Sequence, residues 1–117
     1  MLIPDVYDNR TIYRYKAKPT SKIYVGSFEL RNCGDRYEIW CLGIDGRYRN
    51  NGYGTKMLTE FLATFHHDKP LILYVHKENA VAIHLYEKVG FAICEKWPFS
   101  KCIWTMKYHE RNRNHSC

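Results

Sequence analysis

The sequence predicts a mixed α/β fold in which a central sheet carries two main helices, and three observations support this. Residues 71–76 form a short continuous apolar run, which is typical of a buried parallel strand. This run lies between two segments, 52–66 and 79–89, whose apolar residues repeat at helical spacing. Strand signals separated by turn residues precede and follow them, which indicates antiparallel ends. At 117 residues the chain is expected to be one domain over 1–108, followed by a frayed polar tail over 109–117.

The first half of the chain is expected to form three strands, at 11–18, 22–31 and 36–44. The turn signal Asn-Cys-Gly-Asp at 32–35 joins the last two as a hairpin. Strict alternation in the third strand gives it two largely apolar faces, so it is expected to be central. One face would carry Glu38, Trp40, Leu42 and Ile44, and the other would carry Tyr37, Ile39, Cys41 and Gly43.

The second half begins with a polar loop at 45–51 and the first helix, which the Asp-Lys-Pro run at 68–70 ends. The second helix follows the buried strand, and Gly90 is expected to cap its C-terminus. Two closing strands, at 91–96 and 101–108, are expected to pair as a hairpin.

The net charge of +6 is unevenly distributed. Residues 1–46 carry seven Lys and Arg against six Asp and Glu, whereas residues 47–117 carry eleven against six. This excess favours an anionic ligand, either a phosphorylated cofactor or nucleic acid, with a solvated basic surface as the alternative. The five cysteines include no CxxC pair, so no zinc site is indicated. The chain shows no signal peptide and no membrane span, so a cytoplasmic protein without membrane contact is expected.

The segment at 45–55, Asp-Gly-Arg-Tyr-Arg-Asn-Asn-Gly-Tyr-Gly-Thr, joins a buried strand to the start of an amphipathic helix. Gly52 and Gly54 allow the backbone to approach a ligand closely. The first N–H groups of the helix are unpaired and point at that ligand, and Arg47 and Arg49 add positive charge. The segment therefore predicts a phosphate-binding loop at a helix N-terminus, and it is neither a Rossmann fingerprint nor a P-loop.

Two motifs resemble the GNAT superfamily of acetyl-CoA-dependent N-acetyltransferases. Arg-x-x-Gly-x-Gly at 49–54 is similar to the family's Gln/Arg-x-x-Gly-x-Gly/Ala signature, in the same strand–loop–helix context. Residues 73–91 are similar to the family's second half: a strand, Asn79, and a helix that ends in Leu-Tyr-Glu-Lys-Val-Gly-Phe. The two motifs stand at the family's spacing, and the resemblance covers about residues 22–108.

The resemblance implies an acetyltransferase that uses acetyl-CoA as co-substrate and no metal. The sheet of such folds splays between the third strand and the buried strand after the first helix, and the cofactor enters this gap. The backbone of Leu42, Gly43 and Ile44 would pair with the pantetheine arm. Asn79 would hydrogen-bond near that arm, and Tyr86 would protonate the departing CoA thiolate. The pyrophosphate would be held by backbone N–H groups of the loop, from Arg49, Asn50, Asn51, Gly52, Tyr53, Gly54 and Thr55.

The residues themselves agree with the roles of Asn79 and Tyr86. They are seven positions apart, which places them on one face of a helix. A tyrosine near its reference pKa of about 10 stays protonated and can donate to a thiolate. The alternatives are a helix N-cap for Asn79 and an ordinary core tyrosine for Tyr86.

Attack on a thioester needs a neutral amine, and the reference pKa of about 10.4 for lysine calls for a general base. Glu38 is the leading candidate, because residues 38–44 resemble the strand that bears the catalytic glutamate in the histone acetyltransferase branch. Its apolar neighbours are expected to raise its pKa. The alternatives are an ion pair of Glu38 with Arg36 or a lysine, and His76, His84 or water as the base.

The acceptor site is expected to be open. A typical member of the family has two helices before the hairpin that wall the acceptor groove, and the 21 residues before the strand at 22–31 leave no room for them. The alternative is that a second subunit or a partner completes the site. The aromatic residues at 97–99 would then supply a contact, or they only close the hairpin. A protein or peptide amine is the expected acceptor. The alternatives are an acyl-CoA-binding module without turnover, an RNA-linked amine and a small-molecule amine.

Overall fold

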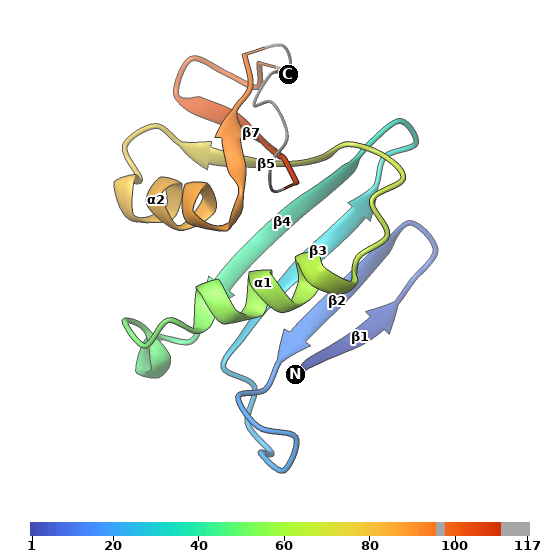
Figure 1. Cartoon of the computed structure of the whole chain (residues 1–117), viewed down its shortest axis with the longest axis vertical. Coiled ribbons are helices and arrows are strands. Elements are labelled where there is room, and N and C mark those ends of the chain that lie inside the picture. The colour runs from blue at the N-terminus through green and yellow to red at the C-terminus, as the bar shows by residue number, and fades with distance from the viewer. Residues whose placement is uncertain (96–97, 111–117) are drawn as a thin grey trace.

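The computed structural model describes residues 1–95 and 98–110, and it forms a mixed sheet with two main helices. The sheet order is β1-β2-β3-β4-β5-β7-β6, in which β4 and β5 are parallel and every other neighbouring pair is antiparallel (Figure 1). The predicted fold class is therefore confirmed. The strands are β1 Leu2–Val6, β2 Arg10–Tyr15, β3 Gly26–Asn32, β4 Tyr37–Ile44, β5 Leu71–His76, β6 Phe91–Ile93 and β7 Ile103–Tyr108. The helices are the 3-10 helix η1 Gly46–Tyr48, α1 Tyr53–Thr64 and α2 Ala80–Val89.

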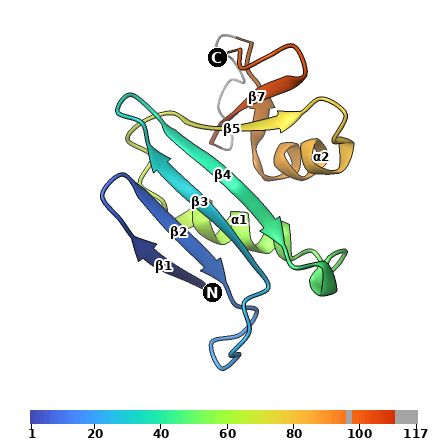
Figure 2. The same cartoon turned by 180° about the vertical axis from the view of Figure 1, so that it is seen from behind.

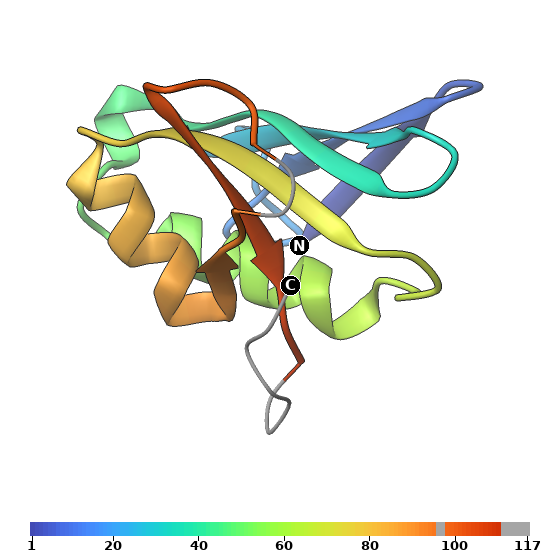
Figure 3. The same cartoon turned by 90° about the horizontal axis from the view of Figure 1, so that it is seen from above.

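Both α-helices lie on one face of the sheet, as Figure 3 shows from the edge. The apolar core fills the space between this face and the helices, and Phe28, Met57, Leu58 and Phe61 are almost fully buried in it. The rings of Phe28 and Phe61 pack edge to face with their centroids 4.9 Å apart. The opposite face of β1 to β4 carries no helix among the described residues (Figure 2).

The strand β1 is a difference from the sequence prediction, which left the first ten residues without a strand. β1 and β2 form a hairpin whose connection is only residues 7–9. Pro4 obscured this strand, because proline is rare in sheet interiors; it is tolerated here because β1 is an edge strand. The two helices expected to be missing have no counterpart in this connection.

The elements around the predicted crossover agree closely with expectation. β5 has the predicted bounds. α2 begins after the N-cap Asn79, whose side chain accepts a hydrogen bond from the N–H of Ala82 at 3.2 Å. Gly90 caps the other end in the left-handed conformation, with φ of +119°. α1 begins at Tyr53, one residue later than predicted, with Gly52 as its N-cap.

A β-bulge interrupts the alternation that was predicted for β4. Cys41 and Leu42 together oppose the single residue Phe28 of β3, and Cys41 has a φ of +55°. A bulge inserts one extra residue into a strand, so every later side chain changes face relative to strict alternation.

The predicted faces of β4 are therefore wrong beyond the bulge. Leu42 and Ile44 pack against the helix-side core together with Ile39. Glu38 and Trp40 precede the bulge and point to the opposite, open face. The bulge thus separates the candidate base from the backbone segment that was expected to border the cofactor.

The closing hairpin is shorter than predicted, because β6 ends at Ile93 and β7 begins at Ile103. His109 does not fray: it is buried, and its N–H donates to the carbonyl of Gly90 at 2.9 Å. Trp97 and the remainder of the predicted tail, 111–117, lie outside the described residues. Within the described part of the chain, no helix is both long enough and apolar enough to cross a bilayer.

Candidate active site

The pairing of β4 and β5 stops partway along both strands. Their parallel ladder ends at Ile39 and Leu73, although β4 continues to Ile44 and β5 continues to His76. The predicted splay between these strands is therefore confirmed. Beyond this point the backbone groups of β4 that face β5 have no strand partner, which leaves them available to a polar ligand.

The end of β4 borders this gap with its backbone. Asp45 donates its N–H to the carbonyl of Val25 at 2.8 Å, so the alternation of an antiparallel ladder turns the backbone groups of Ile44 away from β3 and into the gap. The carbonyl of Ile44 accepts a hydrogen bond from Nε of Arg49 at 3.3 Å. This edge suits the amide groups of a pantetheine arm, which bond to backbone in the same way as a neighbouring strand.

The loop from 49 to 55 lies directly after this edge and opens α1. Asn50 and Gly52 adopt left-handed conformations, with φ of +66° and +76°. The side chain of Asn51 holds the turn, donating to the carbonyls of Tyr48 and Arg49 at 3.3 and 3.0 Å. In the described part of the chain, no backbone N–H between 49 and 55 donates a hydrogen bond. These donors and the dipole of α1 suit a pyrophosphate.

The arginine side chains around the loop, unlike its backbone N–H groups, already have partners. Arg47 forms an ion pair with Asp45 at 3.3 Å, whereas among residues 1–95 and 98–110 the side chain of Arg49 bonds only to the Ile44 carbonyl. Arg49 is therefore the arginine that remains to meet an anion. Gly54 serves packing: a Cβ there would lie 3.1 Å from Cδ2 of Leu85 on α2, so the missing side chain lets the two helices approach.

Asn79, the N-cap of α2, and Tyr86, within α2, differ in how far they are exposed to solvent. Asn79 is exposed, and its carbonyl oxygen is used for the N-cap, which confirms that alternative. Its side-chain NH₂ donates to no other described residue. Tyr86 is only 8% exposed, and burial raises the pKa of its hydroxyl. The neighbouring Leu85 contacts the start of α1, so this part of α2 lies against the loop.

Glu38 lies on the open face, one residue before the ladder ends, and is 5% exposed. It accepts hydrogen bonds from Nε1 of Trp40 at 2.7 Å, the hydroxyl of Tyr74 at 2.8 Å and Nε of Arg36 at 2.9 Å. Burial acts to raise the pKa of Glu38, but these three donors outweigh it and hold the pKa below its ordinary value. The expected rise in the pKa of Glu38 is therefore wrong. The predicted ion pair with Arg36 is confirmed.

Tyr74 and Trp40 are site residues that the sequence reading did not single out. Their ring centroids lie 5.4 Å apart, one on each side of the gap. Burial, and then the adjacent carboxylate of Glu38, raise the pKa of Tyr74 to about 12. Trp40 is two residues from Glu38, so the spacing already placed it on the same strand face. No sequence signal linked Tyr74 to Glu38, because they are 36 positions apart.

The structure thus gathers the predicted residues into two groups. The backbone of 42–44, the loop at 49–55 and α2 meet around the gap on the helix side of the sheet. Glu38 lies on the open face and forms no hydrogen bond to any of these three described segments. His76 and His84, the rival bases, are both exposed. The gap between β4 and β5 borders both groups.

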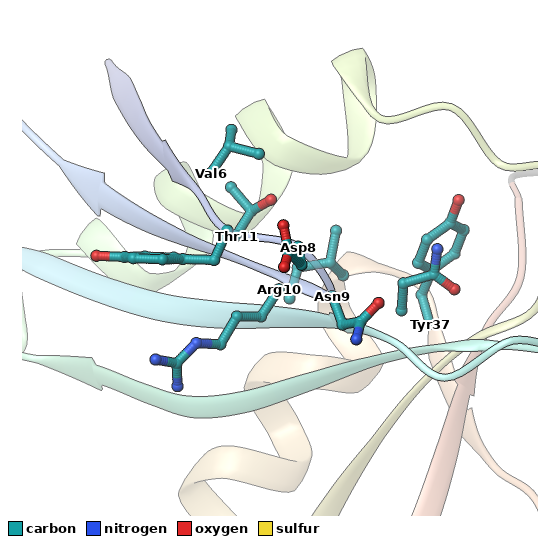
Figure 4. Close-up of a pocket in the computed structure, with 9 residues that line it drawn as sticks. Val6, Asp8, Asn9, Arg10, Thr11 and Tyr37 are labelled. Carbon is teal, nitrogen blue, oxygen red and sulfur yellow. The ribbon is translucent and has the colours of Figure 1, made fainter.

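A pocket of about 180 Å³ lies elsewhere, at the connection between β1 and β2 (Figure 4). Its lining comes from residues 6–11, together with Leu30, Asn32 and Tyr37. Tyr37 begins β4, so the pocket lies at the opposite end of that strand from the loop at 49–55. The chemistry expected from the sequence is therefore not placed in this pocket.

The segment that contains β4, the loop and β5 is similar to known proteins. A model of the acetyltransferase (GNAT) family matches residues 8–91. Over 70 residues the chain is 36% identical to a mycothiol acetyltransferase of Corynebacterium aurimucosum, a match that covers 57% of this chain and 21% of that protein. The chain therefore spans about a fifth of the length of this relative.

Solved structures share the fold. The PaiA N-acetyltransferase of Thermoplasma acidophilum in complex with coenzyme A superimposes with a TM-score of 0.67 at 22% identity, over 86% of this chain and 60% of that one. The F149A mutant of the spermidine N-acetyltransferase SpeG of Vibrio cholerae gives a TM-score of 0.66 at 18% identity, over 86% of this chain and 66% of that one. At these identities the likeness extends to the fold alone.

Proposed function

This chain belongs to the acetyltransferase (GNAT) family, and we propose that it transfers the acetyl group of acetyl-CoA to a primary amine on a protein or peptide. The observation that carries the proposal is the gap where β4 and β5 part beyond Ile39 and Leu73. The loop at 49–55, with its unused N–H donors, follows directly from the end of β4. Gap and loop together suit the two polar parts of an acyl-CoA, its amide-bearing arm and its pyrophosphate.

The donor would be held mainly by backbone. Of the predicted residues Leu42, Gly43 and Ile44, Ile44 turns its backbone groups into the gap and would bond the pantetheine arm, whereas Gly43 lies in register with Ser27 and faces β3. The loop N–H groups would bind the pyrophosphate with Arg49 beside them, and the NH₂ of Asn79 would reach the arm from the start of α2. The residues present therefore fit an acyl-CoA. Because most of these contacts are backbone, we expect single side-chain substitutions in the loop to weaken binding only modestly.

The reaction forms a C–N bond between the acceptor amine and the acetyl carbonyl carbon and breaks the C–S bond of the thioester. The amine loses one proton and the departing thiolate gains one. Tyr86 is proposed to donate the second proton. Its burial supports one requirement of this role, because a hydroxyl with a raised pKa is protonated at neutral pH and so has a proton to donate.

Glu38 is proposed to accept the proton of the amine. Its position one residue from the end of the β4–β5 ladder supports this role. Because its pKa is lowered, it is ionised throughout the neutral range, and it acts as a weak base that also attracts the incoming ammonium group. His76, His84 or water are the alternatives.

The proposal is tested by thiol release from acetyl-CoA with peptide amines as acceptors. Removal of a general acid or base typically lowers a rate by 10²- to 10⁴-fold. We expect losses of about this size in kcat for Tyr86→Phe and Glu38→Gln, with little change in the affinity for CoA. Tyr13→Phe, which removes a hydroxyl from a partly buried core tyrosine away from the gap, is the matched control. Equal rates for all four proteins with every acceptor would refute the catalytic proposal.

A second candidate is an acyl-CoA-binding module without turnover. The three-residue connection between β1 and β2 favours it, because the helices that wall an acceptor groove are absent from this connection. Thermal melting with CoA separates the two candidates. A ligand at 100 times its Kd adds about 2.7 kcal/mol to the free energy of unfolding. Such a shift without acetyl transfer to any acceptor supports the module, and no shift contradicts both candidates.

A further inference from the structure

A row of contacting side chains crosses the open face of the sheet, from the gap to β2. Each member contacts the next, first through aromatic rings and then through charges. On the side of β1 to β4 where this row lies, the described chain places no helix (Figure 2). In order from the gap outward, the members of this open-face row are Phe99, Tyr74, Trp40, Arg31, Glu29 and Arg10.

The aromatic end of the open-face row lies at the gap. The rings of Tyr74 and Phe99 have centroids 4.4 Å apart, and those of Trp40 and Phe99 are 6.4 Å apart. Phe99 is 50% exposed, so this end is an apolar platform open to solvent. An acceptor whose amine enters the gap from this side would rest its apolar stem on these rings.

The other end of the open-face row is positively charged. The guanidinium of Arg31 lies 4.5 Å over the ring of Trp40, and its Nε donates to Glu29. Arg10 pairs with the same carboxylate at 3.3 Å. One buried carboxylate is thus shared by two arginines that are each about half exposed, so the pair retains donors for a second anion.

The second buried carboxylate of this face, Glu38, also has arginine neighbours. Glu38 lies directly across from Arg31 in the β3–β4 register, and Arg36 pairs with it at 2.9 Å. Arg36 also pairs with the exposed carboxylate of Asp35 at 2.8 Å, so the charges around Arg36 are balanced. Excess positive charge is confined to Arg10 and Arg31, which share the single carboxylate of Glu29. An acceptor with an acidic group next to its amine meets this excess positive charge.

The length of the open-face row indicates the size of the acceptor. Three strand spacings of about 4.8 Å separate β5 from β2, a span of about 14 Å. An extended peptide rises about 3.4 Å per residue, so the row matches about four residues. A small amine would occupy only the aromatic end.

We propose that the open-face row recognises a peptide acceptor that carries an acidic residue within two positions of its amine, with Arg31 as the specificity-determining residue. The apolar stem next to the amine rests on Trp40 and Phe99, and the acidic side chain bonds the exposed guanidinium edge of Arg31. This inference rests on the proposed acetyl transfer and narrows its acceptor class.

The test uses tetrapeptides with one free amine, at the N-terminus, and Asp or Asn at the second or third position. We expect acetyl transfer to the Asp peptides to exceed transfer to the Asn peptides by about tenfold in kcat/KM, as for one charged hydrogen bond. Arg31→Gln should abolish this preference, mainly through KM. Arg14→Gln is the matched control, because Arg14 pairs with Asp5 at 3.3 Å on β1 and β2, away from the gap. It should retain the preference.

Equal use of Asp and Asn peptides by the wild type, or a preference that survives Arg31→Gln, would overturn the inference. Equal use of free aspartate, or better use of spermidine, would overturn the peptide assignment. If CoA binds but no acceptor is acetylated, the proposed function fails, and the same peptides carrying a fluorophore are then titrated by anisotropy with CoA present. Tighter binding of Asp than Asn peptides, lost in Arg31→Gln, still supports recognition, and equal binding refutes it.

Discussion

The hydroxyl of Tyr74 on β5 donates a hydrogen bond of 2.8 Å to Oε2 of Glu38 on β4, next to the point where these strands stop pairing. The bond joins the two strands on the open face beside the end of their ladder. It also completes the donor set that keeps Glu38 ionised in a buried position. The protonation of Glu38 therefore links the shape of the gap to pH.

The free energy of unfolding should fall in acid as Glu38 becomes protonated. A carboxyl whose pKa is lowered by folding contributes stability that is complete above its ordinary pKa of 4.5 and is lost as pH falls through the lower folded value. We expect Glu38→Gln to be less stable than the wild type at neutral pH, and the difference in Tm to shrink progressively below about pH 4.5. A constant Tm difference across this range would contradict the expectation.

Tyr74→Phe should act on the same carboxylate. Loss of one hydrogen bond to a charged group costs about 1.5 kcal/mol, and we expect roughly this decrease in the free energy of unfolding from urea titrations at pH 7. The pKa of Glu38 should move back toward 4.5, so the acid-induced loss of stability should be smaller than in the wild type and complete at a higher pH. Tyr108→Phe, whose ring also packs in the closing part of the sheet, is the control.

The pH dependence of acetyl transfer should identify the base. With Glu38 as the base, kcat/KM should show no acidic limb between pH 6 and 7, because its pKa is lowered and it is already ionised there. The reference pKa of histidine is about 6.5. An acidic limb near that pH that disappears in His76→Gln or His84→Gln would assign the base to that histidine instead.

Gly52 and Gly54 should respond differently to alanine, although both belong to one motif. Gly52 has φ of +76° and free space around a Cβ, so Gly52→Ala meets only backbone strain, which costs about 1 kcal/mol. Gly54→Ala meets Cδ2 of Leu85 at 3.1 Å, a flexible side-chain end, and gains about 1 kcal/mol of helix propensity. We expect Gly54→Ala to be nearly neutral and Gly54→Val to cost more, as urea denaturation would measure. A larger loss from Gly54→Ala than from Gly52→Ala would show that the packing of α1 on α2 is the tighter constraint.

The outer edge of β1 is protected against added strands. The N–H of Leu2 donates to Oε2 of Glu60 on α1 at 2.6 Å, and Pro4, two residues on along the same edge, has no N–H. We expect the double variant Pro4→Val with Glu60→Ala to self-associate in light scattering at concentrations where the wild type and Pro4→Val alone do not. A double variant of unchanged size would show that another feature guards this edge.

Local signals explain which elements were predicted well. β5 is a continuous apolar run, and α2 lies between an N-cap asparagine and a C-cap glycine, so each carries its own boundaries. β1 was missed because Pro4 argues against a strand unless its edge position is known. The bulge at Cys41 was missed because its cause is the register of β4 on β3, which no pattern within β4 reveals.

The sequence by itself determined the fold class, the loop at 49–55 and the helix that carries Asn79 and Tyr86, because spacing, glycine positions and caps are properties of neighbouring residues. Only the tertiary structure decided where the candidate base lies and how it is charged. The bulge turned Leu42 and Ile44 to the face opposite Glu38, and Tyr74, 36 positions away, joined Trp40 and Arg36 in lowering the pKa of Glu38. The physical reason is that the pKa of a buried carboxylate depends on which donors the fold brings within hydrogen-bonding distance. The most distant of these donors in sequence, Tyr74, cannot be linked to Glu38 from the sequence alone.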